Sequence, residues 1–148
     1  MRNLLKGAFY MMLAIALISC SDDEEYVEPI LDVTPNNIAG EWCLESWNDA
    51  PLAEGSYVYI SFERADRTYT LYQNVDSAPS RTLTGRYYIT TDMEFGAVIR
   101  GDYDFGVGEW AHRYVVKDLT AKSMTWIAKD NPDDVSVYVR CEIPEQVK

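Results

Sequence analysis

Few residues in this chain have the types and spacing that catalysis or metal binding requires. His112 is the single histidine, and it lies in a predicted strand without a nearby serine or cysteine motif. A catalytic triad that uses histidine would therefore have to be built around this one residue. Zinc sites are equally short of ligands, because the three cysteines are separated in the chain. Gly101, Gly106 and Gly108 lie around a turn without the lysine and serine of a phosphate-binding loop. We therefore expect no catalytic residue, no metal and no cofactor.

Two acidic clusters, at residues 130–134 and 102–104, supply oxygen atoms that a calcium ion could use. Neither cluster has the spacing and glycine of an EF-hand loop. The first is more simply a hairpin turn, in which Asn and Asp lie beside Pro132. Paired carboxylates for glycoside hydrolysis stay open as an alternative, but no spacing singles out two particular acids.

The N-terminal segment is typical of an export signal. Two basic residues precede an apolar stretch over residues 8–18, which is about half the ~20 residues that a membrane-spanning helix needs. Leu17, Ser19 and Cys20 match the bacterial lipobox, which this segment resembles. The resemblance implies that a signal peptide, residues 1–19, is cleaved and that Cys20 becomes the lipidated first residue. An ordinary signal peptide with an incidental cysteine is the alternative.

An acidic run, Ser21–Glu25, follows Cys20 directly. It resembles the export signal by which Bacteroidetes-type lipoproteins reach the outer face of the outer membrane. The resemblance implies a protein that is lipid-anchored in the outer membrane and exposed at the cell surface, with the periplasmic face as the alternative. The plainer interpretation is a solvated tether, because a short block of like charges is usually disordered.

Composition favours a secreted globular domain on a stalk. The chain has 24 acidic against 13 basic residues and a formal net charge of −11. Nucleic-acid binding depends on basic patches and is therefore disfavoured. Residues 20–37 are rich in acid and contain Pro29 and Pro35, which predicts a lipidated, disordered tether. Residues 38–148 then have the length of one domain with one core.

Within residues 38–148 the hydrophobic period is two rather than 3.6. Val58, Ile60 and Phe62 share one face of a predicted strand, with tyrosines and polar residues on the other face. The same alternation, with turn residues between, predicts eight strands, over residues 40–47, 57–63, 67–72, 81–91, 96–103, 110–117, 123–129 and 135–143. This pattern indicates an all-β sandwich or barrel, and eight strands are enough to close a small barrel.

Gly40-Glu41-Trp42, at the head of the first predicted strand, resembles the Gly-X-Trp motif of lipocalins and of lipocalin-like domains in Bacteroidetes lipoproteins. Further fragments, such as Gly85–Ile89 and Tyr138–Arg140, resemble residues that those domains carry at corresponding places. The resemblance implies an eight-stranded antiparallel up-and-down barrel over residues 38–148. It also implies that Trp42 packs at the closed end of the barrel beneath Arg140.

The same resemblance places the two remaining cysteines. If Trp42 and Arg140 point inward, Cys43 and Cys141 point outward, because side chains alternate along a strand. The first and last strands of a closed barrel are neighbours, so the two thiols would lie across from each other on the outer face. Cys43 and Cys141 are therefore a disulfide candidate in an oxidising compartment, with free thiols as the alternative.

Aromatic residues are the better indication of function, with 11 tyrosines and 4 tryptophans. Aromatic faces bind sugar rings and flat apolar ligands, although tyrosine is also a good strand former. In the register set by Trp42, eight residues point inward and either line a cavity or fill the barrel: Phe62, Tyr69, Leu71, Tyr87, Ile89, Tyr114, Met124 and Trp126. Six of them are the ligand-cavity candidates: Phe62, Tyr69, Leu71, Tyr87, Tyr114 and Trp126.

One short motif concerns modification. Asp76-Ser77-Ala78 resembles the O-glycosylation sequon of exported Bacteroidetes proteins, with Ser77 as the acceptor. The motif falls in a predicted exposed turn.

The function expected from the sequence is a non-catalytic binding module for a small apolar or glycan-like ligand, held at the membrane by its N-terminal lipid. One alternative is an accessory subunit of an outer-membrane or cell-surface protein assembly, which predicts a filled barrel and an exposed apolar patch. The other is a small hydrolase with a carboxylate-based site inside the barrel.

Overall fold

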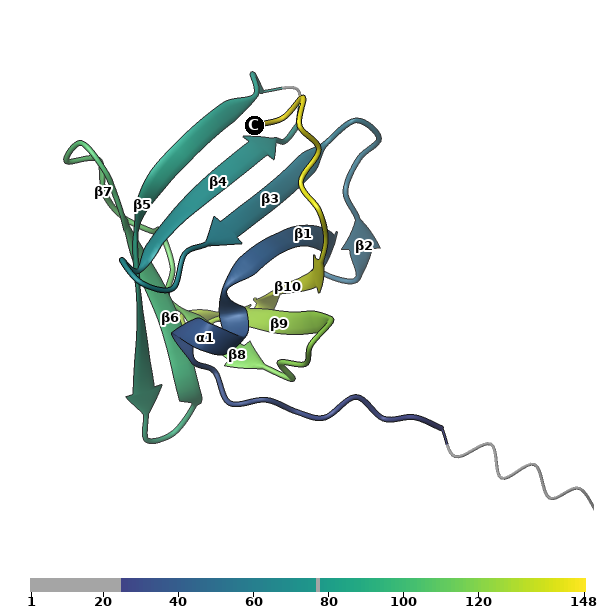
Figure 1. The fold of residues 1–148 in the computed structure, drawn as a ribbon, viewed down its shortest axis with the longest axis vertical. Helices are drawn as coiled ribbons and strands as arrows, with labels where there is room; N and C mark the ends of the chain where they lie inside the picture. The colour runs from purple at the N-terminus through teal and green to yellow at the C-terminus, as the bar shows by residue number, and fades with distance from the viewer. Residues whose placement is uncertain (1–24, 77) are drawn as a thin grey trace, which may run out of the picture.

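The computed structural model describes residues 25–76 and 78–148, so Cys20 and Ser77 lie outside the described residues. Within that part of the chain, no helix has the length and hydropathy of a membrane span. A short helix, α1 (Pro35–Ile38), precedes the strands (Figure 1). The strands are β1 (Gly40–Trp47), β2 (Ala50–Pro51), β3 (Tyr57–Phe62), β4 (Thr68–Asn74), β5 (Arg81–Asp92), β6 (Gly96–Tyr103), β7 (Gly108–Glu109), β8 (Tyr114–Lys117), β9 (Ser123–Ala128) and β10 (Asn131–Arg140).

Eight of the described strands close into an antiparallel barrel. In the order β1-β3-β4-β5-β6-β8-β9-β10, each strand pairs with the next, and β10 pairs back with β1. The two-residue strands β2 and β7 only extend β1 and β6 at their ends. The predicted all-β, up-and-down barrel is therefore confirmed, and the pairing of β10 with β1 excludes an open sandwich.

Two predicted strands differ from the structure by more than two residues at one end or both. The strand expected to begin at residue 110 begins at Tyr114, because the chain from Trp110 to Arg113 leaves the sheet. The last strand begins at Asn131 and ends at Arg140. This strand starts four residues before the predicted one. Its extra residues between Asn131 and Val135 are accommodated by a register shift against β9.

Helix α1 closes one end of the barrel, and Trp42 and Arg140 attach it there. Trp42 is fully buried, and its Nε1 donates a hydrogen bond to the carbonyl of Ile38 at 2.8 Å. Arg140 lies directly opposite Trp42 in the β1–β10 register, with its guanidinium 3.8 Å from the centre of the Trp42 ring. The same guanidinium donates to the carbonyls of Asn37, at 2.6 Å, and Ala39. This end of the barrel therefore combines a cation–π contact with charge-assisted hydrogen bonds.

The half of the barrel next to α1 is solid. Ile38, Phe62, Tyr87 and Met124 are all at most 3% exposed and belong to one hydrophobic cluster. The rings of Phe62 and Tyr87 meet edge to face with centroids 5.0 Å apart. Packed side chains therefore occupy the barrel interior at this end.

Part of the segment expected to be a disordered tether lies against the barrel. The N–H of Leu31 donates to the carbonyl of Leu119 at 2.7 Å, and Glu28 forms an ion pair with Lys122 at 2.5 Å. Leu31 and Val33 pack against the core cluster, because they alternate with polar residues and present one apolar face. The packed part of the chain therefore begins before Ile38, and it approaches the barrel beside β8 and β9 (Figure 1).

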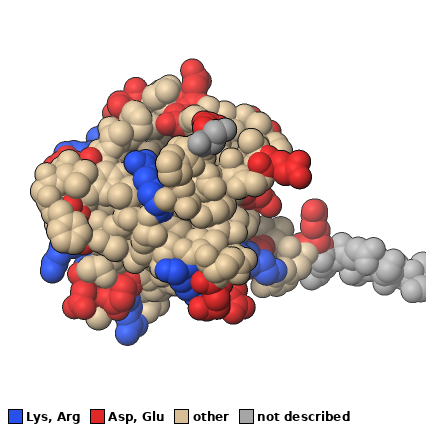
Figure 2. Space-filling view, turned by 90° about the horizontal axis from the view of Figure 1, so that it is seen from above, with Lys and Arg blue, Asp and Glu red and all other residues tan. Residues whose placement is uncertain are grey.

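Charged side chains are spread out on the face seen from above. Figure 2 shows most acidic and basic side chains toward the edge of this view, with a largely uncharged area between them that a basic side chain interrupts. The net negative charge of the chain therefore acts on approaching molecules as a diffuse field on this face rather than through one patch.

Candidate ligand cavity

The barrel half opposite α1 holds an open cavity of about 300 Å³. Its aliphatic side is formed by Leu44, Val58, Ile60, Leu71 and Val75. Leu44 comes from the later part of β1, Val58 from the start of β3 and Val75 from just after the end of β4, while Ile60 and Leu71 lie in the middle of their strands. Because neighbouring strands run in opposite directions, these parts meet at the end of the barrel away from α1. The mouth of the cavity therefore faces away from the closed end.

Four aromatic rings form a continuous wall on the other side of the cavity. We call Trp110, Tyr114, Trp126 and Tyr138 the aromatic wall. The ring of Trp126 is at its centre, with centroid distances of 5.8 Å to Trp110, 5.2 Å to Tyr114 and 4.8 Å to Tyr138. The planes of Trp110 and Tyr114 are tilted by 31° and 33° from that of Trp126. Together these rings give the cavity a broad π surface.

Trp110 reaches the cavity because the neighbouring strand has no side chain at Gly101. A Cβ atom at Gly101 would lie 2.3 Å from the Trp110 ring. The backbone N–H of Trp110 donates to the Gly101 carbonyl at 2.8 Å, and the indole Nε1 of Trp110 donates to the Tyr69 hydroxyl, also at 2.8 Å. These two hydrogen bonds hold the indole in place after the chain has left the sheet.

Among the described residues that line the cavity, Asp134 is the one with a charged side chain. Its Oδ1 accepts a hydrogen bond from Nε1 of Trp47 at 2.6 Å, at the exposed mouth. Burial raises the pKa of Tyr114 to about 12, and the negative charge of Asp134 adds to that effect. Burial also raises the pKa of Tyr138, with Tyr114 and Asp134 contributing in the same direction. Both tyrosines are therefore neutral near pH 7, and the carboxylate is close enough to act on them.

Three of the six residues that we singled out as ligand-cavity candidates line the cavity, namely Leu71, Tyr114 and Trp126. The other three are Phe62, Tyr69 and Tyr87, which are 3%, 2% and 1% exposed and belong to the packed core. Phe62 and Tyr87 fill the closed half, and Tyr69 packs behind Trp110 with ring centroids 5.1 Å apart. Strand parity predicts which side of the sheet a residue faces, but it contains no information on the depth along the barrel axis.

Sequence reasoning missed several lining residues. Trp47 is an odd number of residues from Trp42, so strict alternation places its side chain on the outer face. It reaches the mouth because the β1–β10 register shifts between Leu44 and Ser46. Tyr138 shares the inward parity of Arg140, and this signal was available in the sequence. Asp134 lies in β10, in a segment that we expected to be an acidic turn and considered only as a calcium site.

Cys43 and Cys141 are free thiols in the structure and are half-buried on the outer face of the barrel. The expectation that they lie directly across from each other is wrong. Cys43 pairs with Val139, whereas the Cys141 N–H donates to the Glu41 carbonyl at 3.2 Å, so the two thiols are offset diagonally. The cause is the direct pairing of Trp42 with Arg140. Because β1 and β10 are antiparallel, the residue after Trp42 then lies opposite the residue before Arg140, and not opposite the residue after it. Burial raises the pKa of Cys141 to about 11 and also raises that of Cys43.

The remaining chemical candidates lie outside the cavity. Nδ1 of His112 is 2.8 Å from Oδ1 of Asp130 at the surface. In the acidic cluster at residues 102–104, Asp102 is 3.4 Å from Arg100, and Asp104 accepts a hydrogen bond from Thr84 at 2.7 Å. Among the described residues, no group of three or more His, Cys, Asp and Glu side chains is placed to hold a metal ion.

Comparison with known proteins gives one family match. A family model described as a lipocalin-like domain matches residues 38–126, from the end of α1 into β9. Among solved structures, the chain is similar to a lipocalin-like protein from Bacteroides uniformis, with 18% sequence identity and a TM-score of 0.49. That similarity covers 71% of this chain and 99% of the other. No curated protein matches the chain.

Proposed function

Because this chain belongs to the lipocalin-like domain family, we propose that it is a non-catalytic binding protein that holds a small, largely apolar ligand inside its barrel. The observation that carries this proposal is the open cavity of about 300 Å³, with aliphatic residues on one side and the aromatic wall on the other. Ligand sites of this kind are concave, mostly apolar and equipped with a few polar groups that orient the ligand. Here Gln73, Asp134 and Ser136 supply those groups.

The hollow interior favours binding over the two alternatives. An accessory subunit that needs only a scaffold would be expected to fill its barrel. A carboxylate-based hydrolase needs two acids on either side of the scissile bond, whereas the described lining contributes Asp134 as its acid. The lining combines aliphatic and aromatic side chains with a small number of polar groups, which favours a largely apolar ligand over a glycan.

The proposal extends to where the barrel is held. We infer that Cys20 carries lipid in the outer membrane and that the domain faces the medium, which rests on the lipobox-like and acidic segments of the sequence. The geometry of the described part is compatible with such an anchor, because residues 28–33 reach the barrel near Leu119 and Lys122 on the closed side. The mouth would then open away from the membrane. Labelling of expressed protein with a palmitate analogue tests the anchor: a Cys20→Ala variant should lose the label, and persistent label would contradict the inference.

The binding proposal can be tested by blocking the cavity. In a thermal-shift screen of neutral, cationic and anionic small molecules, we expect at least one class to raise the melting temperature, because a ligand that binds only the folded state stabilises it. The bulky variants Leu71→Trp and Gln73→Trp should each lose this response. Thr70→Trp, whose residue is the neighbour of Leu71 on the opposite face, should keep it.

Three results would contradict the binding proposal. One is a screen without any response, another is a response that survives both blocking variants, and the third is a response that Thr70→Trp abolishes equally. The unliganded melting temperature of each variant shows that it is folded. Because two positions are blocked independently, the test still works if one of the two variants fails to fold.

A further inference from the structure

The charge and the aromatic lining of the cavity are informative about the class of ligand. Of the sixteen residues that line it in the described chain, Asp134 alone is charged at neutral pH, and none is lysine, arginine or histidine. Asp134 forms no ion pair within the described residues; the contact that it makes is the hydrogen bond from Trp47 to Oδ1. The cavity therefore contains a carboxylate whose charge no protein cation balances.

This carboxylate lies beside aromatic rings. Trp47 holds it at the mouth with a donor–acceptor distance of 2.6 Å, and Tyr114 and Tyr138 of the aromatic wall also line the cavity. Aromatic faces carry negative electrostatic potential and attract cations, most strongly where water is excluded. A positive ligand would meet favourable interactions both at the wall and at Asp134. A carboxylate ligand, such as a fatty acid, would meet a like charge in a partly buried site.

The apolar walls limit what kind of cation fits. Leu44, Ile60 and Leu71 offer no partner for the three donors of a strongly hydrated primary ammonium. An alkylated ammonium spreads its charge over methyl or methylene groups and loses less hydration. The acidic surface of the whole chain, with a formal net charge of −11, would increase the local concentration of such cations.

We propose that the cavity binds small organic cations of the quaternary or highly alkylated ammonium class, with the cation against the aromatic wall and its charge balanced by Asp134. This proposal rests on the binding function proposed above and adds the chemical class of the ligand.

Three molecules of nearly the same shape test the charge preference directly. They are choline, its neutral carbon isostere 3,3-dimethyl-1-butanol, and the anion 3,3-dimethylbutyrate, each titrated into the protein by isothermal calorimetry. We expect choline to bind at least about tenfold more tightly than the neutral isostere, which lies between the strengths of an exposed and a fully desolvated cation–π contact. The anion should bind weakest.

Variants at Asp134 separate the ligand class from the cavity itself. Asp134→Asn should reduce the preference for choline over the isostere several-fold, whereas Asp134→Glu should keep most of it. Asp133→Asn is the matched control, because this neighbouring acid is exposed and does not line the cavity. The unliganded melting temperatures should be similar for all three.

The possible failures are distinguishable. Equal or tighter binding of the neutral isostere, or of the anion, would overturn the cation proposal while leaving the binding function in place. A preference for choline that survives Asp134→Asn, or that falls equally in Asp133→Asn, would overturn the role of Asp134. If no molecule of the trio binds, the cation proposal is wrong, and the wider screen with the blocking variants then decides separately whether the cavity binds anything.

Discussion

Replacement of Trp42 by alanine is expected to lower the free energy of unfolding by about 3 to 5 kcal/mol, the range for a large aromatic residue removed from a core. Trp42 is 0% exposed, and its loss also leaves the Ile38 carbonyl without the indole donor. The Arg140 guanidinium would lose the ring beneath it. Urea denaturation followed by circular dichroism measures the change.

Trp47→Ala is the matched control for Trp42→Ala. Trp47 is also a tryptophan of β1, but it is 48% exposed and makes one side-chain hydrogen bond, to Asp134. We expect this variant to lose about 1 kcal/mol. If both variants lost the same stability, the closed end would not be the anchor of the fold that its contacts indicate.

Gly85→Ala is expected to destabilise the barrel by about 3 kcal/mol, at the upper end for an overpacked site. A Cβ atom at Gly85 would lie 1.8 Å from the backbone carbonyl oxygen of Asp102 and 2.8 Å from the Tyr69 hydroxyl. Asp102 belongs to β6, which is paired with β5 along its whole length. The carbonyl cannot move away without breaking that pairing, so relaxation is limited.

The control for this glycine is Thr82→Ala, at an exposed position of the same strand. It should change the free energy of unfolding by less than about 0.5 kcal/mol. Thermal and urea denaturation of both variants give the comparison. A Gly85→Ala protein as stable as the parent would show that β5 and β6 are less tightly coupled than their register indicates.

Local alternation of side chains made the strands predictable. In β3 the burial pattern alternates residue by residue from Tyr57 to Phe62, which is the period-two signal that the sequence shows. Closure was expected from the number of strands and from the resemblance to lipocalins, which places Trp42 beneath Arg140, and these two residues pair between β1 and β10 in the structure.

The cavity was less predictable, because its position depends on depth and on irregularities in the strands. Phe62 and Leu71 both face inward, yet Phe62 fills the closed half and Leu71 lines the open one. Trp47 reaches the mouth only through the register shift in β1. Trp110 enters through the space that Gly101 leaves open. Such features arise from pairing between distant strands, and a pattern within one strand does not contain them.

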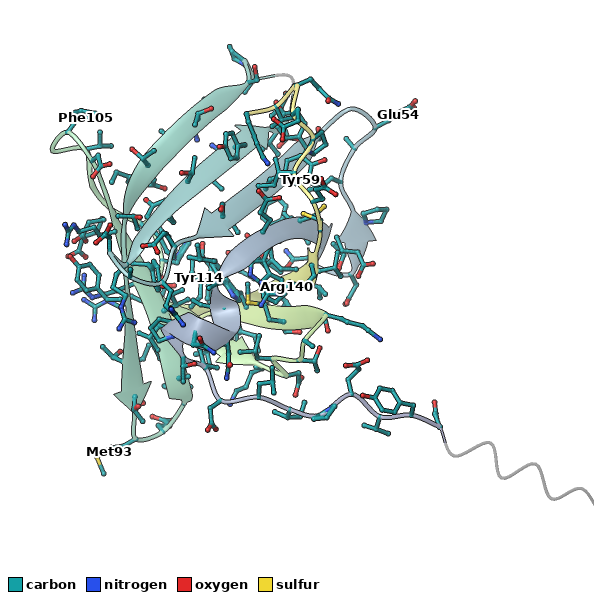
Figure 3. All side chains as sticks on the ribbon, in the orientation of Figure 1. Glu54, Tyr59, Met93, Phe105, Tyr114 and Arg140 are labelled. Atoms are coloured by element: carbon teal, nitrogen blue, oxygen red, sulfur yellow. The ribbon has the colours of Figure 1, made fainter. Side chains whose placement is uncertain are left out.

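The tryptophans allow a direct test of where the ligand sits. The chain has 4 tryptophans: Trp47, Trp110 and Trp126 line the cavity, and Trp42 lies at the closed end. In ¹⁵N-labelled protein each indole N–H gives its own NMR signal, so one titration reports on both ends of the barrel. Figure 3 labels Arg140 beside α1, which locates the closed end for this comparison.

On titration with choline, we predict that the indole signals of the three cavity tryptophans shift together and saturate, while the Trp42 signal stays in place. The shared dissociation constant should agree with the calorimetric value. Cavity signals that do not move as choline is added, or a Trp42 signal that moves as much as the other three, would contradict the claim that the open half of this barrel binds organic cations.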